Sequence, residues 1–395
     1  MRTTMLLTLF SSIACTAALE VRPSGDAATA ALNDAAVLDD AAVLDDAAVL
    51  DAAASPDAAV IAFPDAAVIA SADAATMPSS EVRVVQESCA GRSPPGATCR
   101  TLEVECEGLE PLPLALHVRT PAAGTAQRGV LMLGSGGSGT GLWSGPPTAD
   151  AMIDRMVTAG FVVIEREWLN VRERGWFESA GGLGVRAASC RLAAVLAFVD
   201  REYRRGDQPL CATGNSGGSA ELAYAVLAQR AGEVLDLAVP SSGPFHRLDL
   251  ACAGADDPTW QTECAAVKAR RCPSCANRVC SLGGGPRGLI DQSYGTMDTP
   301  CTGRSTAIDT ALLATDGPLS MLRALPHTRV VLLIGEQDPG GYAPMSAALY
   351  EGLLAGGVDV AFESEPATGH EFASTEAGAL RIEQVLMREC VRRHP

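Results

Sequence analysis

Lysine and histidine are scarce in this sequence, and each shortage narrows what the protein can do. Lys268 is the only lysine, and we attribute the near-exclusive use of arginine to compositional bias. The basic residues form no stripe of the kind that binds phosphate backbones, so the sequence argues against a nucleic-acid partner. The chain has only five histidines. If catalysis uses a histidine as its general base, there are therefore few candidates for that role.

The acidity of the chain is concentrated in one segment. The formal net charge is -17, but residues 21–80 contain ten aspartates and one arginine, a sum of -9, and the first twenty residues sum to zero. The remaining -8 is ordinary for a chain of this length. The charge by itself therefore identifies no partner.

Residues 1–20 have the pattern of a secretory signal peptide. Arg2 precedes an apolar run at residues 5–10, which is too short to anchor the chain across a bilayer, and small residues then lead to Cys15. The four residues ending at Cys15 resemble a bacterial lipobox, with serine where leucine is usual. We expect export, with a lipidated Cys15 as a membrane tether at the outer membrane or cell surface. Ordinary cleavage near Ala17 or Ala18, giving a secreted or periplasmic protein, is the alternative.

Residues 21–80 are expected to form a disordered tether rich in aspartate and alanine. Asp-Ala-Ala-Val-Leu-Asp occurs three times within residues 34–51, and looser copies follow at residues 56–62 and 64–70. This period is too short for a repeat unit with its own core. The regular aspartates suggest calcium binding, but the segment lacks the glycine and glutamate of an EF-hand loop. A solvated tether is the better interpretation.

The thirteen cysteines also favour export. With Cys15 set aside, twelve remain, an even number that suits disulfide pairing in an oxidising compartment. The Cys-Pro-Ser-Cys segment at residues 272–275, with Cys264 and Cys280 nearby, would resemble a zinc knuckle in a cytosolic protein. In an exported protein we expect disulfides there instead, and no metal.

Residues 81–395 have the pattern of one folded α/β domain. Alternating stretches at residues 82–87, 101–107 and 112–118 predict an antiparallel region. Apolar strands and helical stretches then alternate, which indicates a mostly parallel sheet covered by helices on both faces. The predicted strands are residues 129–133, 161–165, 210–214, 234–239, 329–334 and 358–363, and the predicted helices are residues 148–159, 186–203, 219–229, 344–354 and 375–391.

Residues 244–326 interrupt this alternation. The segment contains six cysteines and a run of three glycines at residues 283–285. A structureless connection of this length is improbable in a compact domain unless it is functional. We predict a cysteine-rich cap, braced by disulfides and inserted after the sheet strand predicted at residues 234–239.

The motif that carries most chemical information is Gly-Asn-Ser-Gly-Gly at residues 214–218. It lies between a predicted strand and a predicted helix, which is the context that a nucleophile elbow requires. An elbow holds its serine in a strained conformation, and small neighbours let the turn pack. Ser216 is therefore the candidate nucleophile, placed near a helix N-terminus that stabilises negative charge.

On this motif, residues 110–393 resemble the α/β-hydrolase superfamily, whose catalytic residues follow the order serine, acid, histidine. The resemblance implies that Asp338, in the loop after the strand at 329–334, is the acid that orients the histidine. It also implies that His370, a few residues after the last strand, is the base. Asp249 is a minor rival for the acid, because some relatives place it after the sixth strand. The similarity of residues 344–370 to dienelactone-hydrolase and feruloyl-esterase relatives is weak.

The same resemblance implies an oxyanion hole. It would combine the backbone N–H of Gly217 with one from the glycine loop at residues 134–139. Ser135 is the expected donor in that loop, and Gly136 is the alternative. No Gly-Lys-Ser/Thr follows the loop and its spacing does not suit a dinucleotide, so phosphate binding is disfavoured.

Three other interpretations stay open at this point. Residues 214–218 are similar to the Gly-Asp-Ser-Gly-Gly of trypsin-like proteases, but those enzymes need histidine before serine, and only His117 precedes Ser216. A serine peptidase of the α/β-hydrolase fold is a second. The third is a surface-tethered binding protein whose hydrolase fold has lost activity.

Taken together, these observations predict an exported serine hydrolase that acts on esters. Its substrate would be a small-molecule or polymer ester, and no cofactor is expected. Four aromatic residues, which are more often core, could line an acyl pocket: Trp143, Trp168, Trp176 and Phe177. The sequence leaves the oligomeric state open.

Overall fold

The computed structural model describes residues 80–89, 93–170, 175–178, 183–244, 247–253, 257–280, 284–295, 300–303, 313, 315–318 and 325–392. Spatial contacts divide the chain into Met1–Pro64 and Asp65–Pro395, and the described residues all belong to the second unit. The predicted signal peptide, Cys15 and residues 21–79 of the predicted tether lie outside the described residues.

The sheet begins with an antiparallel region, as the alternating pattern predicted. Strands β1 (Ser80–Gln86), β2 (Thr98–Cys106) and β3 (Leu112–Arg119) pair antiparallel in chain order, and β3 pairs antiparallel with β5 (Phe161–Trp168). The side chains of β2 alternate between more and less buried positions, because one face of the strand packs on the core.

The rest of the sheet is parallel, which confirms the mostly parallel architecture. The strand order is β1-β2-β3-β5-β4-β6-β7-β8-β9. Every pair from β5 to β9 in this order is parallel. The chain crosses from β4 to β5 on one side and then to β6 on the other, and ligands bind at the carboxyl ends of strands beside such a reversal. The remaining strands are β4 (Gly129–Gly134), β6 (Leu210–Asn215), β7 (Leu237–Ser241), β8 (Arg329–Gly335) and β9 (Val360–Glu365).

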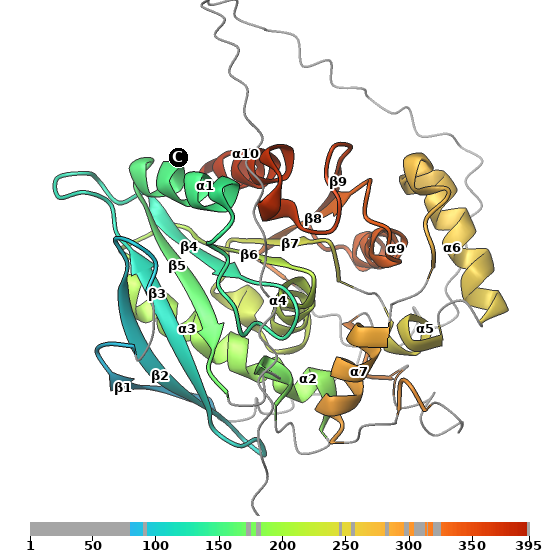
Figure 1. The fold of residues 1–395 in the computed structure, drawn as a ribbon, viewed down its shortest axis with the longest axis horizontal. Helices are drawn as coiled ribbons and strands as arrows, with labels where there is room; N and C mark the ends of the chain where they lie inside the picture. Colours follow the sequence, from blue (N-terminus) through green and yellow to red (C-terminus); the bar gives the residue numbers. More distant parts are fainter. Residues whose placement is uncertain are drawn as a thin grey trace, which may run out of the picture. The chain divides into compact units, whose positions relative to one another are not determined.

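Helices cover both faces of the sheet, again as predicted (Figure 1). Side chains alternate along β4: Leu131 and Leu133 join one core cluster, and Val130 and Met132 join another. The first cluster includes apolar side chains of α1 (Pro147–Thr158) and α10 (Glu376–Arg392). The second includes those of α3 (Cys190–Tyr203), α4 (Gly217–Ala228) and α9 (Tyr342–Ala355). Strands β4 and β8 are almost entirely apolar because both of their faces are buried.

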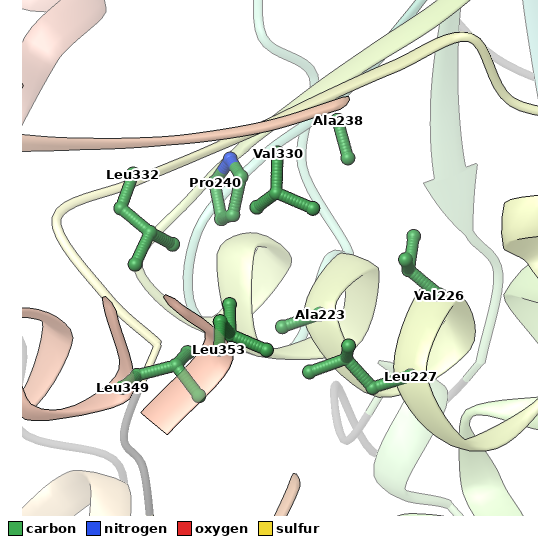
Figure 2. A pocket seen from close by; sticks show the side chains of 9 residues that line it. All are labelled: Ala223, Val226, Leu227, Ala238, Pro240, Val330, Leu332, Leu349 and Leu353. Atoms are coloured by element: carbon green, nitrogen blue, oxygen red, sulfur yellow. The ribbon is translucent and has the colours of Figure 1, made fainter. Parts of the chain in front are cut away.

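A small cavity lies in the second cluster, between α4, β7, β8 and α9. Its lining is wholly apolar and includes Leu227, Leu332 and Leu353 (Figure 2). Because no polar group is present to orient a ligand, we interpret the cavity as a packing feature of the core.

Several predicted boundaries shift by two or three residues, and hydrogen bonds explain two of the differences. The helix expected at residues 186–203 is divided into α2 (Gly184–Ala188) and α3 at Ser189, whose hydroxyl donates to the Arg186 carbonyl oxygen at 2.7 Å. Such a bond from a serine competes with helical hydrogen bonding. The strand expected from residue 234 begins at Leu237, because the N–H groups of Val234 and Leu235 instead donate to the Ala231 carbonyl.

The described parts of the predicted cap segment are helices and turns, without a strand. It contains α5 (Leu248–Ala253), α6 (Pro258–Arg271), the short turn η5 (Pro273–Cys275) and α7 (Gly284–Ser293). Its six cysteines pair with one another, as Cys252–Cys301, Cys264–Cys280 and Cys272–Cys275. The four cysteines considered for zinc are thus joined as disulfides. Its role as a cap stays a prediction.

Three further disulfides brace the sheet domain, Cys89–Cys99, Cys106–Cys190 and Cys211–Cys390. The six disulfides account for twelve of the thirteen cysteines, and Cys15 is outside the described residues. Across the part of the chain that is described, no helix has both the length and the hydrophobicity needed to cross a membrane.

Candidate active site

Ser216 occupies a sharp turn between β6 and α4. Its backbone has φ 51° and ψ -118°, the strained conformation expected at a nucleophile elbow. The glycines on either side are required by packing: a Cβ added to Gly214 would lie 2.4 Å from the Gly218 carbonyl oxygen, and one on Gly218 would lie 2.4 Å from that of Ser135. The motif therefore presents the Ser216 hydroxyl at the carboxyl edge of the sheet.

The structure brings the three residues expected to form the triad into hydrogen-bond contact. His370 Nε2 lies 2.8 Å from Ser216 Oγ, and His370 Nδ1 lies 2.7 Å from Asp338 Oδ2. Asp338 is 2% exposed and follows β8. The backbone N–H of Gly340 donates to its other carboxylate oxygen at 2.8 Å. Both oxygens of Asp338 thus have a donor, which holds the carboxylate toward the imidazole.

Charge around His370 favours its protonated form. Burial lowers the pKa of His370, but the hydrogen bond and the charge of Asp338, together with the charge of Glu371, outweigh burial and raise the pKa above its ordinary value of 6.5. Glu371 is held beside the elbow, because Asn215 Nδ2 donates to it at 3.3 Å. The imidazole is therefore well suited to accept a proton from Ser216.

The glycine loop after β4 packs on the nucleophile turn. A Cβ added to Gly136 would lie 3.3 Å from Ser216 Cβ, and one added to Gly217 would lie 1.8 Å from the Gly137 carbonyl oxygen. Ser135 directs its carbonyl toward Gly218, and its hydroxyl donates to the Gly141 carbonyl at 2.5 Å. Of the two candidate donors, Gly136 is thus the one whose Cα faces the nucleophile.

Tyr342 belongs to the site and was missed in the sequence. It begins α9, its ring centroid lies 4.6 Å from that of His370, and Ser216 is among the groups that influence the pKa of its hydroxyl. Burial and the nearby Asp338 charge raise the pKa of Tyr342 to about 12, so the phenol keeps its proton at neutral pH. Its position four residues after the expected acid was the available clue, but spacing alone does not show which way a side chain turns.

The other candidates from the sequence lie elsewhere. Asp249 accepts two hydrogen bonds from Arg247, at 3.0 and 2.6 Å. The four aromatic side chains considered for an acyl pocket are at most 4% exposed and belong to the two large core clusters: Trp143, Trp168, Trp176 and Phe177. They are accordingly core residues in the described structure.

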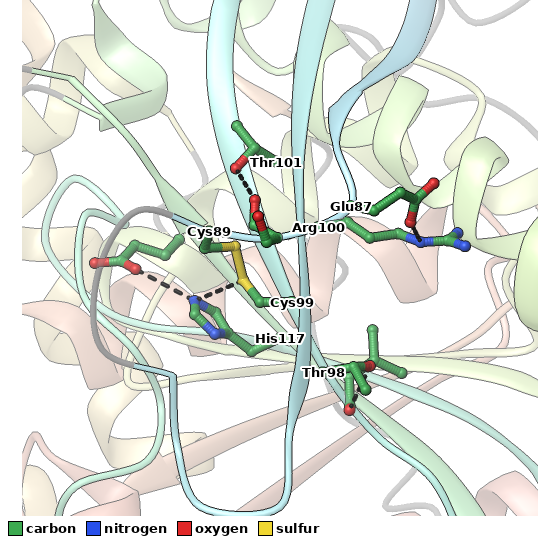
Figure 3. Close-up of a disulfide and its surroundings, with 10 residues drawn as sticks. Glu87, Cys89, Thr98, Cys99, Arg100, Thr101 and His117 are labelled. Atoms are coloured by element: carbon green, nitrogen blue, oxygen red, sulfur yellow. Dashed lines mark hydrogen bonds and ion pairs between the residues drawn. A yellow bond between two sulfur atoms is a disulfide. The ribbon is translucent and has the colours of Figure 1, made fainter.

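A group of three metal-type ligands occurs at the antiparallel end of the sheet. The ligand atoms of Cys89, Cys99 and His117 lie within 4.8 Å of one another (Figure 3). The two sulfur atoms are bonded to each other, so neither is a free thiolate. His117 Nε2 also lies 3.4 Å from Glu167. We interpret the group as a disulfide with a packed histidine.

Comparisons with known proteins give distant structural similarity. No protein-family model and no curated protein matches the chain. A solved brefeldin A esterase, a bacterial homologue of human hormone-sensitive lipase, is 18% identical over 78% of this chain and 81% of that chain, with a TM-score of 0.47. A putative dienelactone hydrolase from Klebsiella pneumoniae is 11% identical over 80% and 99%, with a TM-score of 0.43.

An acylaminoacyl peptidase from Pyrococcus horikoshii is 11% identical over 74% of this chain and 42% of that chain, with a TM-score of 0.46. Structural similarity at such low sequence identity does not assign an activity to this chain. Three features are observed directly in this structure and do not depend on the comparisons. These are the strand order, the strained serine turn after β6, and the positions of Asp338 and His370 after β8 and β9. They are the features of the α/β-hydrolase fold that the sequence predicted.

Proposed function

We propose that the protein is a serine hydrolase that cleaves carboxylic esters through an acyl-enzyme formed on Ser216. The observation that carries the proposal is the continuous line of hydrogen bonds from Ser216 through His370 to Asp338. A serine hydroxyl is a weak nucleophile at its own pKa, and an adjacent base that is oriented by a third group activates it.

The reaction has two acyl-transfer steps. His370 Nε2 takes the proton of Ser216 as Oγ attacks the ester carbonyl carbon, and Asp338 stabilises the imidazolium that forms. The N–H groups of Gly217 and of Gly136, with Ser135 as the alternative, stabilise the oxyanion. His370 then gives the proton to the departing alcohol. Water, deprotonated by His370, attacks the acyl-enzyme, and the acid leaves as Ser216 regains its proton.

Esters are preferred to amides because the alkoxide of an ester is a much better leaving group than the amide anion of an amide. Hydrolysis of p-nitrophenyl esters of increasing acyl length, compared with p-nitroanilides of the same acids, tests this preference. Ester turnover that disappears in Ser216→Ala supports the proposal. Faster cleavage of the anilides would favour a serine peptidase of the same fold, and no turnover of either series would favour a binding protein.

The rate is expected to fall as the pH drops through the pKa of His370, because only the neutral imidazole can accept the Ser216 proton. That pKa is raised, partly by Glu371. We therefore expect Glu371→Gln to move the acidic limb of the kcat/KM profile to lower pH. Glu365→Gln, which changes a carboxylate at the end of β9, is the control. An unshifted limb in Glu371→Gln would contradict this electrostatic role.

Tyr342→Phe removes one oxygen atom from the site and is expected to lower kcat about tenfold or more, because a polar contact beside the reacting oxygen is lost. Tyr350→Phe is the matched control, since Tyr350 lies on the same helix and packs its ring 5.7 Å from that of Phe362. Steady-state kinetics with one activated ester checks the prediction. Equal kcat values in the two variants would show that the Tyr342 hydroxyl takes no part.

We also propose that the protein is exported and tethered to a membrane through a lipidated Cys15. Twelve cysteines joined in six disulfides support an oxidising compartment. Expression of the full chain in a bacterium fed an alkyne-labelled fatty acid tests the tether. Label that is lost in Cys15→Ser supports it, whereas an unlabelled, secreted wild type would support simple signal cleavage.

A further inference from the structure

A buried ion pair lies between the nucleophile helix and the strand that follows the glycine loop. Arg166, on β5, is 1% exposed, and Glu221, on α4, is fully buried. Arg166 Nη2 donates to Glu221 Oε2, and Trp168 Nε1 donates to Glu221 Oε1 at 2.9 Å. Both oxygens of the carboxylate are therefore satisfied away from water.

The same arginine supports the glycine loop. Arg166 Nη1 donates to the Gly139 carbonyl at 3.3 Å, and the Trp168 backbone N–H donates to the same oxygen at 2.9 Å. A Cβ added to Gly139 would lie 2.3 Å from Arg166 Nη1, and one added to Gly134 would lie 2.9 Å from Nη2. The guanidinium thus fills the space that side chains at Gly134 and Gly139 would occupy, which explains why these two positions are glycine.

The other end of the pair is attached to the nucleophile turn. Glu221 lies five residues after Ser216, in the second turn of α4. The loop that contains Gly136 and the helix that begins at Gly217 are the two expected sources of oxyanion donors. One ion pair therefore connects both halves of the expected oxyanion hole.

Stability alone does not account for this pair. Burial raises the pKa of Glu221 to about 7 and lowers the pKa of Arg166, which reflects the cost of removing both charges from water. Apolar residues of similar size often replace a buried ion pair without loss of stability, whereas removing one partner alone is strongly destabilising. A positional role is a reason for a fold to retain such a pair.

We propose that Arg166 and Glu221 are positioning residues that hold the loop at residues 134–141 against Ser216, so that its N–H groups are aligned on the oxyanion before substrate arrives. The inference rests on the proposed function. Misaligned donors would weaken binding of the transition state and leave ground-state binding unchanged, so the pair acts on kcat and not on KM.

The test uses the full chain with both charges replaced, Arg166→Met with Glu221→Leu, which avoids an uncompensated buried charge. The control is Arg204→Met with Asp236→Asn, an ion pair of 2.9 Å between the end of α3 and the residue before β7. Three quantities are measured: kcat and KM for an activated ester, the melting temperature, and amide hydrogen exchange of the peptide covering residues 134–141.

We expect the Arg166/Glu221 double variant to melt near the wild-type temperature, to lose about 10- to 100-fold in kcat with KM unchanged, and to exchange faster in residues 134–141. The control should change neither kcat nor loop exchange. Wild-type kcat and wild-type exchange in the Arg166/Glu221 variant would overturn the inference. A wild type that hydrolyses no ester and reacts with no serine probe would refute the proposed function instead, and loop exchange would still report whether the pair holds the loop.

Discussion

His370→Ala is expected to lower kcat for an activated ester by about 10⁶-fold, because a triad without its base loses almost all of its acceleration. His370 is partly exposed at the carboxyl edge of the sheet. Among the described residues, its imidazole ring forms hydrogen bonds only with Ser216 and Asp338. Its loss should therefore affect the chemistry far more than the stability, which falls only modestly because Asp338 Oδ2 loses its donor. Initial rates and thermal melting of the purified variant measure both.

His327→Ala is the matched control, since His327 is an exposed histidine in the turn that precedes β8, at the opposite edge of the sheet. It should retain wild-type kcat. A His370→Ala variant that keeps substantial activity would show that another group deprotonates Ser216, and the assignment of the base would then be wrong.

The Cys211–Cys390 disulfide is expected to be the largest covalent contribution to stability. It joins β6, which leads directly to Ser216, to α10 across 179 residues, and both cysteines are buried. Closing so long a loop restricts the unfolded chain strongly, so Cys211→Ala with Cys390→Ala should lower the free energy of unfolding by about 5 kcal/mol. Urea unfolding followed by circular dichroism measures the change.

Removal of the Cys89–Cys99 disulfide provides the comparison, because it closes only 10 residues. The same entropic argument assigns it about 3 kcal/mol. If the two double variants lost equal stability, or if the shorter loop mattered more, loop entropy would not explain how these disulfides stabilise the domain.

The sequence was most informative where one local pattern carried both structure and chemistry. Gly214, Ser216 and Gly218 fall within five residues, and strand–helix alternation on either side predicted the turn that they form. Asp338 and His370 could be proposed because the α/β-hydrolase resemblance implies an acid and a base that each follow a recognisable strand. The mostly parallel sheet was predictable because strands buried on both faces are apolar throughout.

The missed features depend on contacts between residues far apart in the chain. Tyr342 meets Ser216 only after α9 docks, and Arg166 meets Glu221 only when β5 and α4 pack together, 55 residues apart in the chain. No local sequence pattern marks an arginine as buried. The glycines that make room for Arg166 were therefore interpreted only as part of the expected oxyanion loop. The disulfide pairs were unpredictable for the same reason, because cysteine spacing permits many connectivities.

The proposed role of Ser216 is tested by intact-mass analysis of the full chain after reaction with a fluorophosphonate probe, beside Ser216→Ala treated identically. We expect a single adduct on the wild type and none on the variant, because only an activated serine attacks the phosphorus centre. Well-folded wild-type protein without an adduct would contradict the proposed hydrolase mechanism.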